Sequence, residues 1–253
     1  MTTNLWLSLL PLLAKFRQLP LSVLVITALV ALASAGSAQA ALLKSYDFDG
    51  DYSDTLGNGV NLIPAGGSIS GGRYNFSLNQ GLQLLTALPS TTDYGIEIRF
   101  QVNDEVSQFN KLIDFKNLSA DSGMYQHNGG LYFYSSGPQS PSGTFLLNTD
   151  HTVGLARSGG SIQVFLDGVP IAAPLGDGGN LAVPPDNILH FFQDDAASDV
   201  FIGSAEFIRI HNDFSTFGLA PNFAPNSPAI PEPTSLLLLG LGALGLFRFR
   251  QRK

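Results

Sequence analysis

Cysteine is absent from the 253-residue chain, which also contains only one Trp and two Met. Without cysteine, a disulfide framework, a thiolate metal site and thiol redox chemistry are all excluded. Charge is scarce as well, since charged side chains make up 13% of the residues. The folded part must therefore be held together by its apolar core, and a domain of about 170 residues is large enough for this.

Basic residues are rare in the centre of the chain. Residues 41–230 contain 19 acidic and 7 basic side chains, a net charge of −12. Nucleic acids and anionic lipids both require a basic surface on their partner. The charge balance therefore excludes nucleic acid as a partner, and it suits solubility or the binding of a cation such as calcium.

An apolar segment near the N-terminus follows Lys15 and Arg17 and ends in small residues, with Ala38 and Ala40 in an A-x-A pattern. A basic flank, an apolar stretch and a small-residue exit are typical of a secretory signal peptide. We predict a helical leader over residues 1–40 that is read by Sec-type export machinery and cleaved after Ala40. A permanent N-terminal anchor is the alternative, because the apolar stretch is long enough to span a bilayer.

A second apolar run, residues 236–247, lies near the C-terminus and is followed by a basic end. As a helix its 12 residues would span ~18 Å, because an α-helix rises about 1.5 Å per residue, whereas a hydrocarbon core is about 30 Å thick. We expect a short helix in transient membrane contact, with its basic end kept on the cytoplasmic side. A poorly matched stop-transfer helix is the alternative.

The motif Pro231-Glu232-Pro233 precedes this run. Together, the motif, the apolar run and the terminal basic cluster resemble the PEP-CTERM sorting tail of exported bacterial proteins. The resemblance covers residues 231–253. It implies that exosortase, a membrane protease-transpeptidase, processes the tail and that the protein reaches the cell surface or the extracellular space. The proline-rich residues 216–230 are predicted to be a linker.

Residues 41–215 have an all-β pattern. Residues 96–102 alternate strictly between apolar and polar, as in a half-buried antiparallel strand. Gly159-Gly160 and Asp167-Gly168 indicate tight hairpin turns. Short strands separated by turns predict a two-sheet antiparallel jelly-roll sandwich. Further strands are predicted within residues 111–116, 130–136, 143–148, 188–193 and 205–212.

Four segments of this region, KSYDFDGDYSDTLGNGVNL, YGIEIRFQV, TVGLARSGGSIQVFLDGVPI and AEFIRIHN, carry a second resemblance. In this order they are similar to segments of laminin G-like, concanavalin A-like domains. The sequence departs from that family at His211, where Tyr is usual, and in the Pro/Gly/Ser-rich residues 135–144. The resemblance implies a jelly roll, a fold that often carries calcium at a sheet edge.

Two groups of carboxylates are candidate calcium ligands, because calcium binds six to eight oxygen atoms. A solvated acidic loop is the alternative for the first group, and a charged turn that ends a strand is the alternative for the second. If the two groups met in space, they would form one calcium site. The first group consists of Asp47, Asp49, Asp51 and Asp54, and the second of Asp194 and Asp195.

A tyrosine-rich segment is the candidate ligand surface. Tyr132 and Tyr134 share one face of a predicted strand, and Tyr125 and Asn128 lie just before it. Sugar rings stack on exposed aromatic side chains, while amide groups fix their hydroxyls. The alternative is that the tyrosines pack against their neighbours on the outer side of a sheet.

Motifs for catalysis are missing from the sequence. It has no E-x-D-x-E triplet of the glucanases with this fold, no G-x-S-x-G, no P-loop and no H-E-x-x-H. We therefore predict a non-catalytic exported protein that binds carbohydrate or another surface polymer. One alternative is a structural or biofilm-matrix protein with no discrete ligand. Another is a glycoside hydrolase, which in its retaining form requires two carboxylates about 5–5.5 Å apart.

Overall fold

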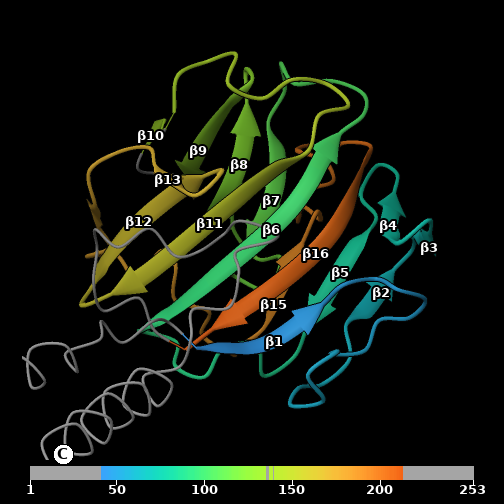
Figure 1. The fold of residues 1–253 in the computed structure, drawn as a ribbon. Coiled ribbons are helices and arrows are strands. Elements are labelled where there is room, and N and C mark those ends of the chain that lie inside the picture. The colour runs from blue at the N-terminus through green and yellow to red at the C-terminus, as the bar shows by residue number, and fades with distance from the viewer. Residues whose placement is uncertain (1–40, 135–136, 139, 213–253) are drawn as a thin grey trace, which may run out of the picture. The chain divides into compact units, whose positions relative to one another are not determined.

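The computed structural model describes residues 41–134, 137–138 and 140–212. Strands are the only regular elements within these ranges, and they form two antiparallel sheets (Figure 1). The predicted all-β, two-sheet architecture is therefore confirmed. The predicted leader (1–40), linker (216–230) and tail (231–253), with the helices expected in the leader and the tail, lie outside the described residues.

The first sheet has nine strands and is built around β6 (Tyr94–Val102), which lies between β11 (His151–Ser158) and β16 (Gly203–His211). The path across the sheet is β13-β12-β11-β6-β16-β4-β3, with β1 paired to β16 and β14 to β12. The remaining strands are β1 (Leu42–Tyr46), β3 (Ser68–Ser70), β4 (Arg73–Phe76), β12 (Ser161–Leu166), β13 (Val169–Pro170) and β14 (Leu175–Gly176).

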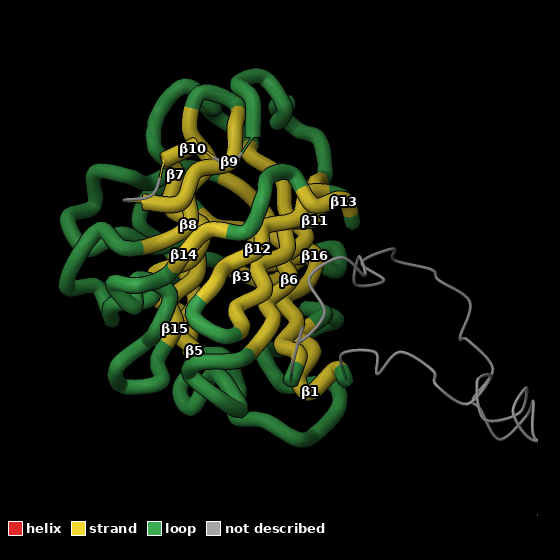
Figure 2. The backbone as a smooth tube through the Cα atoms, turned by 90° about the vertical axis from the view of Figure 1, so that its left-hand side faces the viewer, coloured by secondary structure: helices red, strands yellow, loops and turns green. Residues whose placement is uncertain are grey.

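The second sheet has seven strands in the order β10-β9-β8-β7-β15-β5-β2. Figure 2 shows β5, β7, β8 and β15 in one layer and β6, β11 and β16 in the other. The strands are β2 (Ile63–Ala65), β5 (Gly81–Leu84), β7 (Asn110–Asp114), β8 (Gly123–His127), β9 (Gly130–Tyr134), β10 (Gly137–Pro138) and β15 (Leu189–Phe191).

Apolar alternation places β6 at the centre of the first sheet. Ile98 lies opposite Val153 of β11 on one side and Ile208 of β16 on the other, and each of the three is at most 1% exposed. Because side chains alternate between faces with a period of two, residues 96, 100 and 102 enter the core together with Ile98. The predicted strand over residues 96–102 is confirmed.

The predicted tight turns are also present. Gly159 and Gly160 join β11 to β12 with φ of 55° and 74°, and Asp167 and Gly168 join β12 to β13 with φ of 50° and 80°. Two consecutive positive φ angles are required by the type I′ turn that matches the twist of a hairpin. Glycine adopts these angles without steric cost, which is why the sequence signal was reliable here.

The strand predicted over residues 143–148 is wrong. These residues form a turn-rich loop, in which the amide of Phe145 donates to the carbonyl of Gly129 over 2.7 Å. The Phe145 ring is buried against Phe100, with ring centroids 5.9 Å apart, whereas Leu146 is 61% exposed. One buried ring therefore anchors the segment, and the apolar run that suggested a strand is not buried as a run.

Aromatic side chains fill the space between the sheets. Phe76 stacks on Phe192 with ring centroids 4.5 Å apart and meets the edge of Phe201 at 5.1 Å. Such stacked and edge-to-face pairs stabilise a core beyond the burial of their area. The residues of this buried core come from positions 46 to 210 of the sequence. Residues 41–212, which we call the body, therefore contain their own core and are expected to fold as a unit.

The two ends of the body are neighbours. The amide of Ala41 donates to the side-chain oxygen of Asn212 over 2.8 Å, and the amide of Asn212 donates to the carbonyl of Ala41 over 3.0 Å. They extend the pairing of β1 with β16 along the lower side of the sheet in Figure 1. The chain therefore enters and leaves the body at neighbouring positions.

The close approach of β5 to β15 gives a test of the packing. A Cβ atom on Gly81 would lie 2.3 Å from the carbonyl oxygen of Phe191 and 2.9 Å from Cβ of Gln193, so Gly81→Ala must displace backbone. We expect a loss of about 1–3 kcal/mol in the free energy of unfolding. The control is Gly176→Ala, where the added Cβ meets no atom within 4 Å. Thermal unfolding of the body measures both, and equal melting temperatures would contradict the described register.

Candidate functional site

The first acidic group surrounds a loop after β1. Asp54 is 7% exposed, and its carboxylate accepts hydrogen bonds from the backbone amides of Ser45 (2.8 Å) and Asn58 (2.8 Å). Carboxylates that accept such bonds commonly fix turns. Asp54 therefore fastens the loop containing Gly57 and Gly59 to the end of β1.

The other carboxylates of this group also have local partners. Asp47 accepts from the Thr55 hydroxyl at 2.9 Å and lies 3.6 Å from the guanidinium of Arg209, while Asp51 accepts from the amide of Ser53 at 2.8 Å. Asp49 is exposed. Calcium binding at Asp47, Asp49, Asp51 and Asp54 stays a prediction, and the described contacts of Asp54 account for it without an ion.

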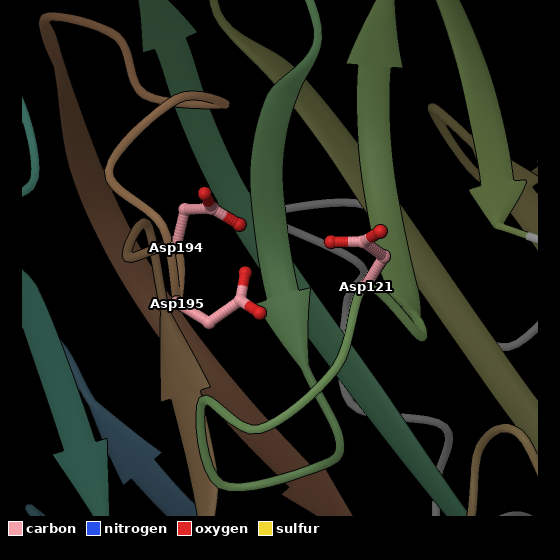
Figure 3. Close-up of side chains that lie close together, drawn as sticks. All are labelled: Asp121, Asp194 and Asp195. Carbon is pink, nitrogen blue, oxygen red and sulfur yellow. The ribbon is translucent and has the colours of Figure 1, made fainter.

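The second acidic group gains a third member in the structure. Asp194 and Asp195 follow β15, and Asp121 lies in the loop that leads into β8; Figure 3 shows the carboxylates converging from these two loops. One oxygen of each lies within 4.8 Å of the others. Among the described residues this is the one such group of His, Cys, Asp or Glu, so the two acidic loops do not form the joint site considered above.

A buried lysine lies beside two members of this group, Asp194 and Asp195. The side chain of Lys111 on β7 is 0% exposed, and its Nζ is 3.0 Å from Asp194 Oδ1 and 3.0 Å from Asp114 Oδ2. Asp195 Oδ1 is 3.7 Å away, and the carbonyl oxygen of Ala120 is 3.4 Å away. A buried charge is tolerated when it is paired and hydrogen-bonded, and Lys111 meets both conditions.

Burial and pairing act on the pKa values in opposite directions. Burial alone lowers the pKa of Lys111, but the carboxylate of Asp114 and the Tyr125 hydroxyl outweigh it, so the net pKa is raised. Burial raises the pKa of Asp194, yet the ammonium of Lys111 and the backbone donors bring it to about 2. Burial and the neighbouring Asp194 raise the pKa of Asp195. Lys111 and Asp194 therefore form a charged pair, and folding favours the protonated form of Asp195.

Each partner of Lys111 also closes a turn with its other oxygen. Asp114 Oδ1 accepts from the amides of Lys116 (3.0 Å) and Leu118 (2.9 Å). Asp194 Oδ2 accepts from the amides of Ala196 and Ser198, both at 3.2 Å. The single ammonium thus joins two loops, residues 115–122 and 194–199, whose positions in the chain are far apart.

Tyr125 belongs to the support of this cluster and has little free surface. It is 1% exposed, its hydroxyl donates to the carbonyl of Asp121 at 2.7 Å, and the Lys111 ammonium lies 5.4 Å from its ring centroid. An ammonium over a tyrosine ring is attracted by the π-electrons of the ring. For Tyr125, the structure favours packing over a ligand platform.

The other predicted tyrosines reach solvent. Tyr132 on β9 lies directly opposite Tyr125 and is half-buried, and Tyr134, further along the same face, is 40% exposed. The ring of Phe109 stacks on His127 at 3.6 Å and meets the edge of Tyr132 at 5.4 Å. Phe109, Tyr125, His127, Tyr132 and Tyr134 together form what we call the aromatic surface, on the outer side of the seven-stranded sheet.

Asn128 stands at the edge of the aromatic surface. It is exposed, has φ of 50° in the turn between β8 and β9, and its amide donates to His127 Nε2 over 2.8 Å. This contact holds the His127 ring in place. Asn128 is therefore bonded to His127, whose ring lies 6.3 Å from that of Tyr132, and a ligand role for Asn128 stays a prediction.

The predicted site residues did not include Lys111, Asp121, Phe109 or His127. Lys111 is a single polar residue in an apolar strand, and a bulge between Lys111 and Ile113 turns it to the same side as Asp114. No spacing rule announces a bulge. The β8–β9 hairpin could have placed His127 near Tyr132, since Asn128-Gly129 is a strong turn signal and fixes the register of the two strands.

Comparison with protein families concerns the C-terminal end. Residues 229–253 match the PEP-CTERM protein-sorting motif. The chain carries a PEP-CTERM sorting motif. The motif marks an exported protein of the cell envelope or surface and implies processing by exosortase. The predicted tail at Pro231, Glu232 and Pro233 is thereby confirmed, although these residues lie outside those that the structure describes. No curated protein sequence matches the chain.

Solved structures with a similar fold include sugar-processing proteins. Domain 4 of AbnA, a GH43 extracellular arabinanase from Geobacillus stearothermophilus solved in complex with arabinotriose, is 15% identical with a TM-score of 0.57 over 74% of this chain and 99% of that one. The Trypanosoma rangeli sialidase is 14% identical with a TM-score of 0.56 over 72% of this chain and 32% of that one. The chain thus spans about a third of the sialidase. At such low identity, the structural similarity establishes the fold alone, a β-sandwich.

The described residues contain no helix long and apolar enough to cross a membrane. The apolar run at residues 236–247, where the sequence predicts transient membrane contact, lies outside them.

The crowding of carboxylates at Asp195 predicts a pH-dependent gain in stability. Its pKa is raised in the folded protein, so folding favours the protonated form, and that advantage is lost as the pH rises through the folded pKa. Asp195→Asn should therefore raise the melting temperature at pH 7 and raise it less near pH 4. The exposed Asp186→Asn is the matched control. Melting curves of the body at several pH values provide the measurement, and a gain that grows toward low pH would contradict the described pairing.

Proposed function

We propose that the protein is an exported, non-catalytic module that binds carbohydrate of the cell surface or its surroundings. In this proposal residues 41–215 are a laminin G-like jelly roll. The aromatic surface on the outer side of the seven-stranded sheet is the binding face. Sec-type machinery exports the chain, exosortase acts on the tail, and an extracellular polysaccharide is the partner.

The exposure of Tyr134 beside Tyr132 is the observation that carries the proposal. Aromatic residues are mostly buried in this body, yet Tyr134 is 40% exposed, and its ring lies in an edge contact with the buried ring of Tyr125, with centroids 6.4 Å apart. Tyrosine offers a flat apolar face and a polar hydroxyl together, which suits the apolar and hydroxyl-bearing sides of a sugar. Rings fixed by their neighbours also lose little conformational freedom when a ligand binds.

The polar groups around the rings support the same partner. The exposed side chain of Asn128 lies at one edge, and the body is strongly acidic, so a neutral or cation-bearing polymer is favoured over an anionic one. Asn and Tyr groups bind hydroxyls in either donor or acceptor role. A polysaccharide with few charged groups is therefore the expected ligand class.

Similarity of fold adds to this support. The arabinanase domain, 99% of whose length matches this chain, was solved in complex with arabinotriose. A β-sandwich of this type thus holds a short oligosaccharide in another protein. Fold alone does not transfer a ligand, so arabinotriose serves only as one probe among several.

The burial and the contacts of Asp194, which is adjacent to Asp195, support a non-catalytic role. Asp194 is 1% exposed in its side chain and has its oxygens committed to Lys111 and to backbone amides. A retaining glycosidase needs both carboxylates in reach of the substrate. Asp194 and Asp195 are adjacent but differ in this respect, and a hydrolytic role gains no support from them.

A structural role in the cell surface or matrix is the second candidate. The burial of Tyr125, whose hydroxyl is already bonded to Asp121, favours it, because part of the tyrosine group packs against its neighbours. In that case the rings of the aromatic surface would stiffen the sheet and hold no ligand. Binding data distinguish the two candidates.

Binding to a panel of purified bacterial exopolysaccharides and to arabinotriose tests the proposal. Tyr134→Ala should weaken binding of the body roughly 2- to 10-fold, since an aromatic contact is worth about 0.5–1.5 kcal/mol beyond its area. Val169→Ala, which removes a 61% exposed apolar side chain from the other sheet, should leave binding unchanged. Isothermal titration calorimetry measures the affinities. If the unmodified body binds none of these saccharides, the structural role replaces the proposal.

A further inference from the structure

We infer that the ammonium of Lys111 is the resident cation of the acidic cluster, in the place where the laminin G-like resemblance led us to expect calcium. One consequence is that saccharide binding by the aromatic surface does not require calcium. This consequence rests on the proposed function. The inference itself concerns the cluster and stands on its geometry.

The oxygen atoms around Lys111 Nζ form the kind of shell that a cation requires. Its nearest neighbours are the carboxylates of Asp114 and Asp194, each at 3.0 Å. The Ala120 carbonyl lies at 3.4 Å and Asp195 at 3.7 Å, so one strand and two loops supply the oxygens. An ammonium donates three hydrogen bonds at such distances. Calcium would take the same type of ligands, but at about 2.3–2.6 Å.

A calcium ion does not fit this cluster while Lys111 remains. Asp194 Oδ1 and Asp114 Oδ2 face the ammonium, and their second oxygens are bonded to turn amides, so the ammonium already lies where both carboxylates would hold a metal. The ion would also be placed beside a fixed positive charge at the point where the two loops meet. Of the three clustered carboxylates, Asp121 and Asp195 are exposed, and their four oxygens fall short of the six to eight that calcium binds.

The charge balance supports the same conclusion. Lys111 offsets one negative charge of a cluster of four carboxylates, and Asp195 has a raised pKa through burial and its contact with Asp194. A divalent ion would relieve this crowding further, but the described loops relieve it through backbone amides instead. The turns that a calcium ion would normally order are already closed.

Lys111 also links the cluster to the aromatic surface. The Tyr125 ring lies over its ammonium, and Tyr125 is the direct cross-strand neighbour of Tyr132. The ammonium therefore supports the base of the proposed binding face. In a protein with a metal at this position, removal of the metal would disturb that face, whereas a covalently attached ammonium cannot dissociate.

Calcium titration of three variants of the body tests the inference by thermal unfolding. The unmodified body should have the same melting temperature in millimolar calcium and in chelator. Lys111→Ala should melt roughly 6–20 °C lower in chelator, because removing one partner of a buried pair leaves charges uncompensated. Calcium should then restore part of the loss by entering the emptied shell. Lys116→Met removes an ammonium that is bonded to backbone carbonyls and should show no calcium response.

Two results would overturn the inference. One is a rise in melting temperature of the unmodified body with calcium that Asp194→Asn abolishes. The other is a Lys111→Ala body that folds and gives the same melting temperature in calcium and in chelator.

A measurement on the unmodified body covers the case in which Lys111→Ala fails to fold. A proton–nitrogen spectrum of the lysine ammonium groups should retain one signal at mildly alkaline pH, where exposed ammonium groups exchange with water too fast to be seen. Loss of every ammonium signal under these conditions would overturn the inference. Saccharide binding, measured in calcium and in chelator, tests the proposed function separately. If no saccharide binds in either condition, the proposed function fails, and the melting data still show which cation the cluster holds.

Discussion

An ammonium group without access to water stays charged only where carboxylates surround it, and the arrangement of the seven-stranded sheet depends on this constraint at Lys111. Three carboxylate side chains and two loops are oriented toward one nitrogen atom, and a bulge in β7 follows Lys111. Buried pairs of this kind add little net stability over an apolar replacement, but they penalise every arrangement in which one partner is absent. Arg157 and Asp177, paired at 2.7 Å and both buried, impose the same condition on the loop that follows β14.

Local sequence signals were sufficient where the structure is local. The alternation of residues 96–102 and the turns at Gly159-Gly160 and Asp167-Gly168 depend on neighbours within a few residues, and all were predictable. Residues 143–148 failed because the burial of Phe145 against Phe100 is a tertiary contact that no periodicity reveals.

The candidate site divides in the same way. Tyr132 and Tyr134 share a face because of strand geometry alone, so their relation could be read from the sequence. The meeting of Asp121 with Asp194 depends on where two loops more than 70 residues apart come together, and the role of Lys111 depends on a bulge. The sequence therefore identified Asp194 and Asp195 as candidate residues, but it did not predict that Lys111 would be their partner.

The pairing of Ala41 with Asn212 has a mechanical consequence. The terminal strands β1 and β16 are antiparallel and their outer ends are adjacent, so a force that pulled the two ends apart would strain their hydrogen bonds one after another. Strands opened in this sequential manner resist little compared with strands that are sheared along their length. A body held at both ends would thus open first at its own terminal hairpin-like pair. Attachment through one end alone, with the other released, keeps this weak direction unloaded.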